Sequence, residues 1–132
     1  MSDSKLHTYK TFVSFGDTDS AKRIYFARVF DIAHKCLEDF AQSKGYYERW
    51  FNKMEWATPI IHTEADYNQG LFAGDEIEVH LYPGELGNTS LQFQYVFEKD
   101  GKKVATVKTV HVSLDLETGE KKAVPTELAE LF

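Results

Sequence analysis

The sequence has 132 residues, of which 42% are hydrophobic and 14% are aromatic, and its formal net charge is −6. This composition excludes a disordered chain, and the acidic balance argues against nucleic-acid binding, which depends on Lys and Arg that neutralise phosphates. Cys36 is the single cysteine, so an intrachain disulfide is excluded and a reducing, cytoplasmic location is expected.

No membrane partner is expected, because no apolar run approaches the roughly 20 residues of a membrane-spanning helix. The first five residues, Met1-Ser2-Asp3-Ser4-Lys5, are polar and no apolar segment follows them, which predicts no secretory signal peptide. The chain contains no repeat, no low-complexity stretch and no linker rich in Pro or Gly. We therefore expect a single domain over residues 1–132.

The first half of the chain predicts one strand and one long helix. Residues 7–15 are rich in Thr, Tyr, Phe and Val, which favours a strand, and a polar loop follows from Gly16 to about Arg23. A helix is predicted over about 27–43, with Gly45 as its stop. Its apolar positions recur at helical spacing: Val29, Phe30, Ala33, Cys36, Leu37, Phe40 and Ala41. The aromatic residues of 46–56 predict a packed connector with room for a short helix.

The second half of the chain predicts four more strands. One covers residues 57–68, and after it apolar residues alternate with polar ones around 76–81, 91–98 and 104–112. Turns are indicated by Gly87-Asn88, Asp100-Gly101 and Thr118-Gly119. This order is typical of an α+β fold with an antiparallel sheet packed against one helix. One helix cannot cover both faces of such long strands, so we expect a homo-oligomer.

The loop between the first strand and the helix carries Asp17-Thr18-Asp19. A carboxylate there can attack a carbonyl or activate a water, and the free N–H groups of the helix start can hold an oxyanion. Two Asp residues before a helix are more often a turn and an N-cap. The spacing alone therefore favours the structural explanation.

The segment Phe15-Gly16-Asp17-Thr18-Asp19-Ser20-Ala21-Lys22-Arg23-Ile24-Tyr25-Phe26-Ala27 resembles the signature of the 4-hydroxybenzoyl-CoA thioesterase family, Asp-x-Asp-x-x-Gly-x-x-Tyr. The resemblance implies a hot-dog fold, in which a five-stranded antiparallel sheet wraps one long central helix. It also implies hydrolysis of an acyl-CoA without a metal or redox cofactor. Asp19 matches the catalytic carboxylate, as nucleophile or general base, and Phe26 the residue whose backbone N–H polarises the thioester carbonyl. Asp17 matches a residue that shapes the loop.

Further matches are to the 1,4-dihydroxy-2-naphthoyl-CoA thioesterases within this family, and they favour an aromatic acyl group. They lie in Ile24-Tyr25-Phe26, in His34 and Glu38 on one helix face, and in Pro59-Ile60-Ile61-His62. Thr109-Val110-His111-Val112 and Lys121-Lys122-Ala123-Val124-Pro125 also match. The resemblance thus implies that Tyr25, His34, Glu38 and His62 bind substrate.

The sequence departs from the family pattern at two places. Lys22 stands where the signature has Gly, so we expect the loop to take a different path there. The 4-hydroxybenzoyl enzymes carry basic residues for the CoA phosphates before the fourth strand, where this sequence has the uncharged Gly87-Asn88-Thr89-Ser90. The CoA phosphates then need another basic site. The candidates are Lys22, Arg23, Arg28, Lys102 and Lys103.

Other chemistry is less well supported by the sequence. The five histidines, His7, His34, His62, His80 and His111, show neither an HExxH pattern nor clustering with cysteine, so no metal is expected. His62 and His111 fall in predicted strands, where a buried histidine bonded to backbone is the common arrangement. Cys36 lies in the apolar stripe and is expected to be a core residue.

Two alternatives to the thioesterase stay open at this point. His34 and Glu38 could imitate the His and carboxylate of hot-dog dehydratases, which act on hydroxyacyl thioesters. The Lys22 departure would suit a non-catalytic module that binds acyl-CoA. Release of free thiol separates the hydrolase from both.

Overall fold

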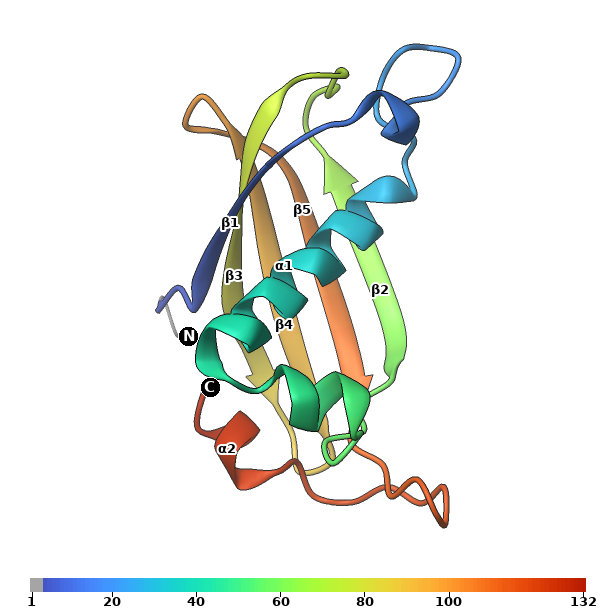
Figure 1. Ribbon diagram of the computed structural model, residues 1–132, viewed down its shortest axis with the longest axis vertical. Helices are drawn as coiled ribbons and strands as arrows, with labels where there is room; N and C mark the ends of the chain where they lie inside the picture. Colours follow the sequence, from blue (N-terminus) through green and yellow to red (C-terminus); the bar gives the residue numbers. More distant parts are fainter. Residues whose placement is uncertain (1–3) are drawn as a thin grey trace.

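A computed structural model describes residues 4–132; the residues Met1, Ser2 and Asp3 of the polar start lie outside this range. Five strands form one antiparallel sheet in the order β1-β3-β4-β5-β2. The strands are β1 (His7–Phe12), β2 (Ile60–Tyr67), β3 (Glu76–Leu86), β4 (Ser90–Lys99) and β5 (Lys102–Val112). The long helix α1 (Arg28–Lys44) crosses one face of this sheet (Figure 1). The predicted arrangement of one helix on an antiparallel sheet is confirmed.

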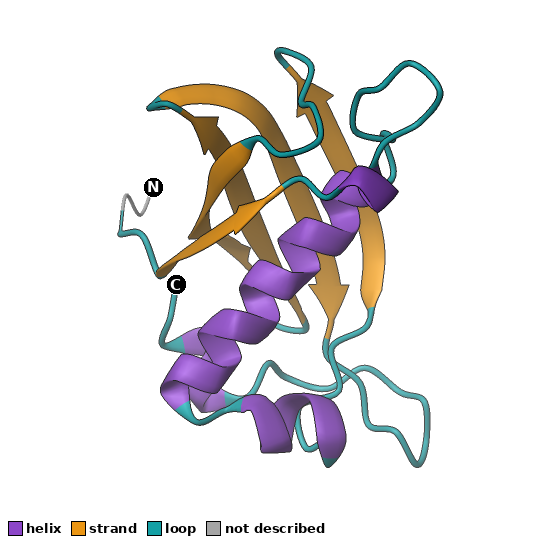
Figure 2. Cartoon of the chain, turned by 45° about the horizontal axis from the view of Figure 1, so that its top comes forward, coloured by secondary structure: helices purple, strands orange, loops and turns teal. Residues whose placement is uncertain are grey.

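The helix forms where the apolar stripe predicted it. Its buried residues are Val29, Ile32, Ala33, Cys36, Leu37, Phe40 and Ala41. Gly45 ends α1 with a φ of 75°, a left-handed conformation that glycine adopts without a Cβ clash, and its N–H donates to the carbonyls of Ala41 and Gln42. Alternate residues of the long strands pack beneath this stripe, among them Val79, Phe93 and Val107. The core therefore lies between α1 and one face of the sheet (Figure 2).

Cys36 is fully buried in this core, as expected from its place in the stripe. Its Sγ–H faces the Val79 carbonyl of β3 at 3.7 Å. Burial, with a smaller contribution from Asp39, raises the pKa of the Cys36 thiol to about 12. A thiol in this setting does not ionise near neutral pH and cannot act as a nucleophile.

Two strands differ from their expected boundaries, β1 at its end and β2 at its start, which is Ile60 rather than residue 57. β1 ends at Phe12 rather than at residue 15, because Phe15–Asp17 forms a single 3-10 turn closed by the bond from Asp17 N–H to the Ser14 carbonyl. The connector after α1 contains one turn of π-helix over Glu48–Asn52, and Trp50 is buried there. A short helix α2 (Thr126–Ala129) closes the chain against the core through Leu128. In the described part of the chain no helix is both long and apolar enough to cross a membrane.

Candidate active site

Asp17 organises the loop between β1 and α1. Its Oδ2 accepts hydrogen bonds from the Ser14 hydroxyl at 2.8 Å and from the Ser14 N–H at 3.3 Å. Its carbonyl accepts the Tyr25 N–H at 2.8 Å. Both the side chain and the backbone of Asp17 are thus engaged within the loop, as the loop-shaping interpretation expects.

Asp19 occupies the tip of the same loop and is exposed. Its Oδ1 accepts the Ala21 N–H at 2.8 Å, which fixes the side chain, while Oδ2 has no hydrogen-bond partner within residues 4–132. The carboxylate borders an open hollow of about 740 Å³. The hollow is lined by Phe15, Gly16, Thr18, Asp19, Ser20, Lys22, Phe72 and Ala73. One oxygen is therefore held and the other is free to meet a ligand beside apolar rings.

Lys22 adopts the backbone conformation that favours glycine, with a φ of 63°. Its N–H donates to the Asp19 carbonyl at 2.9 Å, and the Asp19 N–H donates to the Arg23 carbonyl at 2.9 Å. These two bonds close a tight turn around the carboxylate. Lys22 thus holds a conformation that glycine adopts without a Cβ clash.

Phe26 lies in the turn directly before α1, whose N-cap is Ala27. The Phe26 N–H has no acceptor among residues 4–132, and the side chain is 60% exposed. The Phe26 carbonyl accepts a hydrogen bond from the Tyr67 hydroxyl of β2. Tyr25 stacks its ring at a tilt against Phe26, with centroids 4.9 Å apart. The Phe26 N–H at the start of the helix is therefore free to bind a ligand, while the Phe26 carbonyl is held by a hydrogen bond from Tyr67 of the edge strand β2.

Tyr67 was not anticipated from the sequence. It is 41 residues from Phe26 along the chain, and only the pairing of β2 with β5 brings its hydroxyl to the start of α1. Burial raises the pKa of the Tyr67 phenol, so it remains a donor at neutral pH. Its position near the end of the predicted strand 57–68 gives only a weak indication of a functional role. Nothing in the sequence indicates its contact with Phe26.

His34 and Glu38 face one another on α1, with His34 Nδ1 2.6 Å from Glu38 Oε2. The Tyr47 hydroxyl donates to Glu38 Oε1 at 3.0 Å, and this bond raises the pKa of Tyr47. The Phe51 ring meets the His34 ring edge-on with centroids 5.7 Å apart. The aromatic connector therefore supplies a hydroxyl and an aromatic wall to this pair.

The pair borders a second, smaller hollow of about 410 Å³, which it shares with Asp17. Asp19 borders the larger hollow instead. Three of the predicted site residues thus line two different hollows, Asp19 in one and the His34–Glu38 pair in the other. Tyr25 and Phe26 lie between them in the chain, directly before α1.

His62 is placed differently from the other expected site residues. Its Cα partner is Val110, and its Nε2 contacts Glu64 at 3.0 Å on a strand position that is exposed. The core residues of β5, such as Val107, alternate with Val110, so His62 lies on the face of the sheet away from α1. One protomer does not bring His62 to Asp19 or His34. The expectation of a buried, backbone-bonded histidine is also wrong for His62.

That expectation is confirmed for His111, which is buried in β5. Its Nδ1–H donates to the Thr58 carbonyl at 2.9 Å and its Nε2 accepts from the Thr109 hydroxyl at 2.9 Å. Burial lowers the pKa of His111, with smaller influences from Thr58 and His34. The imidazole is therefore neutral, and its tautomer is set by these two partners.

Two of the candidates for the CoA phosphates are already engaged. The Arg23 guanidinium lies 5.2 Å over the Phe72 ring, and Arg28 pairs with Asp31 at 3.3 Å. Lys22 borders the hollow beside Asp19. Lys102 opens β5 in the hairpin at the same end of the molecule as the loop before α1 (Figure 1). Of this set, Lys22 is the cation next to the free carboxylate.

The family model of the thioesterase-like superfamily matches residues 13–132, nearly the whole chain. The chain belongs to the thioesterase-like superfamily. The match includes the loop with Asp17 and Asp19, the helix and the last four strands, so the superfamily assignment covers both hollows described above.

Two curated relatives carry the same name, 1,4-dihydroxy-2-naphthoyl-CoA hydrolase. The one from Crocosphaera subtropica is 36% identical over 112 residues, covering 82% of each chain. The one from Synechococcus elongatus is 29% identical over 126 residues, covering 94% of this chain and 93% of its own.

The chain also has the fold of a solved thioesterase structure. A 1,4-dihydroxy-2-naphthoyl-CoA thioesterase from Synechocystis superposes with a TM-score of 0.85 over 95% of this chain and 93% of its own, at 22% identity. The hot-dog fold inferred from the signature is thereby confirmed.

Proposed function

We propose that this protein is an acyl-CoA thioesterase that hydrolyses an aromatic acyl-CoA, such as 1,4-dihydroxy-2-naphthoyl-CoA, to the free acid and CoA. The observation that carries the proposal is the Asp19 carboxylate, held by the Ala21 N–H through one oxygen and free at the other, beside an open hollow. Membership of the thioesterase-like superfamily and the names of the relatives support the same chemistry.

In the proposed reaction the thioester carbonyl sits between Asp19 and the start of α1. Asp19 attacks the carbonyl carbon, or takes a proton from the water that does. The Phe26 N–H then donates to the developing oxyanion, helped by the positive end of the helix dipole. Collapse of the intermediate expels the CoA thiolate, and water supplies the oxygen of the acid and the proton of the thiol.

The remaining expected residues have supporting roles in this proposal. Tyr25 and Phe26 offer an exposed aromatic surface at the loop, and His34 with Glu38 offers a polar pair for the ring substituents of the acyl group. Lys22 is the proposed cation for the CoA moiety, because it borders the same hollow as Asp19. No metal or redox cofactor enters these steps.

We also propose a homo-oligomer built on the edge strand β2. The edge of β2 away from β5 has no strand partner within residues 4–132. The strand exposes Ile60, Ile61 and Tyr67, at 43%, 62% and 45%. Unpaired backbone groups beside apolar side chains favour pairing with a second copy. The hydrophobic core that runs from Val13 to Leu128 supports the single domain of 1–132, and the buried, reduced Cys36 supports a cytoplasmic location.

The test is release of free thiol from a panel of aromatic and aliphatic acyl-CoAs. The wild type should release thiol, and Asp19→Asn should lose at least about 10²-fold of the rate, because a general base contributes about 10²–10⁴-fold. Asp100→Asn is the matched control: Asp100 is exposed in a hairpin at a φ of 51°, a conformation that Asn tolerates. A wild-type rate in Asp19→Asn would refute the mechanism.

The same panel separates the dehydratase alternative, which the 2.6 Å contact between His34 and Glu38 favours. A dehydratase converts hydroxyacyl thioesters to enoyl thioesters and leaves the thioester bond intact. Turnover of a hydroxyacyl-CoA without thiol would therefore support the dehydratase, and tight binding without any turnover would support the binding module.

A further inference from the structure

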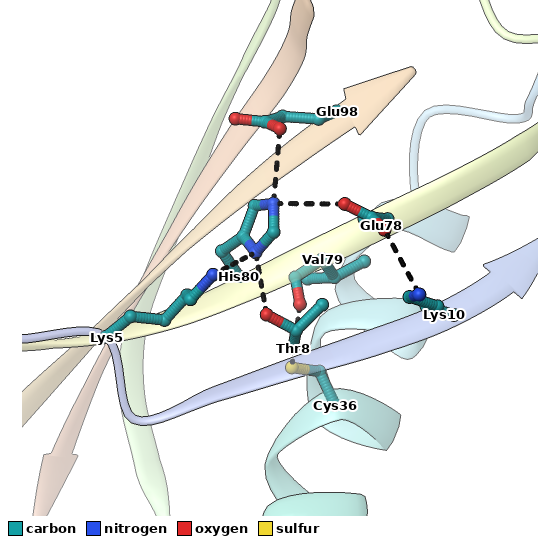
Figure 3. Close-up of polar contacts among 8 residues, drawn as sticks. All are labelled: Lys5, Thr8, Lys10, Cys36, Glu78, Val79, His80 and Glu98. Carbon is teal, nitrogen blue, oxygen red and sulfur yellow. Dashed lines mark hydrogen bonds and ion pairs between the residues drawn. The ribbon is translucent and has the colours of Figure 1, made fainter. Parts of the chain in front are cut away.

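Three side chains with metal-binding groups converge on the face of the sheet opposite α1 (Figure 3). His80 Nε2 lies 3.2 Å from Glu98 Oε1 and 3.6 Å from Glu78 Oε1. One ligand atom from each residue lies within 4.8 Å of the other two. Val79, which alternates with Glu78 and His80 in β3, points into the core, so the cluster is separated from the proposed thioesterase site by the sheet.

The strand register creates this cluster. Glu78 and His80 are two residues apart in β3 and share a face, and Glu98 of β4 is the direct partner of Glu78. Two carboxylates directly opposite one another on one face of an antiparallel pair repel. A bound cation between them would remove that repulsion.

The spacing suits a divalent transition metal. Zinc bonds to imidazole nitrogen at about 2.0–2.1 Å and to carboxylate oxygen at about 2.0–2.2 Å, so tetrahedral ligand atoms lie roughly 3.3–3.5 Å apart. The two distances from His80 Nε2, 3.2 and 3.6 Å, bracket that range. Rotation of the partly exposed Glu78 and Glu98 side chains can bring their oxygens to the same separation.

The second nitrogen of His80 is supported as metal-bound imidazoles usually are. Thr8 Oγ1 of β1 lies 2.9 Å from Nδ1, and its hydroxyl can accept the Nδ1–H that remains when Nε2 binds a metal. His80 is 7% exposed, so its ring is fixed between β1 and β4. The side chain is therefore preorganised to direct Nε2 between the two carboxylates.

Two lysines border the cluster without occupying its centre. Lys10 Nζ lies 3.7 Å from Glu78 Oε2, the oxygen turned away from His80. Lys5 Nζ lies 3.4 Å from His80 Nδ1 and can only donate to it, so the exposed Lys5 side chain has to turn away when Nε2 binds a metal and Nδ1 keeps its proton for Thr8. Beside them an open groove of about 570 Å³ leads to Glu78 and Glu98. Glu76 and Asp100 add two more carboxylates to its lining. The groove gives a cation access and leaves room for a water ligand.

We propose that Glu78, His80 and Glu98 form a site for a divalent transition metal of the zinc class, with water in the fourth position. The imidazole selects against Mg²⁺ and Ca²⁺, which prefer all-oxygen sites. The metal ties β3 to β4 and, through Thr8, holds β1 in the sheet. The site does not depend on the thioesterase proposal.

The experiment is calorimetric titration of tag-free protein, stripped with EDTA, with ZnCl₂. We expect one zinc per protomer for the wild type and at least a tenfold weaker affinity for His80→Gln and for Glu98→Gln. Thr8→Val, which keeps the side-chain shape, should weaken binding by about tenfold, as loss of an outer-shell partner does. X-ray absorption of the zinc complex should show nitrogen and oxygen ligands that include one imidazole.

The matched control is Glu64→Gln, because Glu64 pairs with His62 at 3.0 Å on the same face of the sheet and has no third ligand residue in the part of the chain that the structure describes. It should bind zinc as the wild type does. Glu98 is partly exposed, so Glu98→Gln should keep the fold even if the buried His80→Gln variant does not. Thermal melting of each variant in EDTA checks that it is folded. Wild-type zinc affinity in Glu98→Gln, or no zinc bound by the wild type, would overturn the proposal.

Discussion

Lys22 holds a left-handed backbone conformation in the turn that carries Asp19. A left-handed φ costs an L-residue roughly 1–2 kcal/mol, and the hydrogen bonds on both sides of the Asp19 turn hold Lys22 there. Local strain of this kind is typical of functional loops, where the surroundings over-determine the backbone. The substitution adds an amine to the hollow that Asp19 borders, which glycine could not do.

Tyr67 acts on the proposed oxyanion donor through the backbone. Its hydroxyl holds the Phe26 carbonyl, so Tyr67→Phe should leave the Phe26 N–H less well oriented. One hydrogen bond is worth about 0.5–1.5 kcal/mol, which corresponds to a decrease in kcat of about twofold to tenfold. Steady-state kinetics on the best acyl-CoA should show this decrease in kcat with little change in KM.

Tyr82→Phe is the control for that measurement, because Tyr82 lies in β3 on the face away from α1. It should keep the wild-type kcat. A decrease confined to KM in Tyr67→Phe would contradict a positioning role and point to direct contact with the substrate.

The buried imidazole of His111 makes stability depend on pH. Burial lowers its pKa in the folded protein below the usual value of about 6.5, so below that pH the unfolded chain binds a proton that the folded chain does not. The free energy of unfolding should therefore fall as pH drops from 7 to 5.5, by up to roughly 1.4 kcal/mol per pH unit from this residue.

Urea denaturation of the wild type and of His111→Asn at the two pH values checks this prediction. His111→Asn is less stable at pH 7, since it loses packing and a hydrogen bond, but it should lose less stability on acidification. The difference between the two slopes isolates His111 from other titrating groups. Equal slopes would show that His111 does not carry the pH dependence.

At the scale of single elements, β2 has the most exposed position. It is an edge strand, and its side chains are exposed along nearly its whole length. Ile61→Glu should disrupt the proposed oligomer, because it places a charge where a second copy would pack. Size-exclusion chromatography with light scattering should then show a lower mass than for the wild type.

Leu116→Glu is the matched control for Ile61→Glu. Leu116 lies in the loop after β5 and is 59% exposed, close to the 62% of Ile61. It should leave the mass of the assembly unchanged. An Ile61→Glu protein with wild-type mass would place the interface elsewhere.

Elements with a clear period could be predicted from the sequence. The stripe that includes Val29, Leu37 and Phe40 gives α1 to within a residue, and alternation gives β3, β4 and β5. The end of β1 was harder to predict from the sequence, because it is set by the side chain of Asp17, which closes a turn with Ser14. Local chemistry of that kind interrupts a strand without changing its composition.

At the scale of the whole molecule, the contacts that could not be predicted join residues distant in sequence. Tyr67 meets Phe26 only because β2 pairs with β5 at the far side of α1. Glu78 meets Glu98 only because of the exact register of β3 with β4. A pattern within one segment fixes which face a residue takes but not which residue it faces across a strand, so the Glu78, His80 and Glu98 cluster was invisible to motif spacing.

The burial of Cys36 has a practical consequence at the scale of the whole molecule. With its thiol fully enclosed and its pKa raised to about 12, the chain offers no accessible sulfhydryl to a disulfide reagent while it stays folded. Any colour that such a reagent develops with the native protein and an acyl-CoA comes from the coenzyme product. Because the protein contributes no reacting thiol, the rate of colour formation measures CoA release directly and needs no correction for the enzyme.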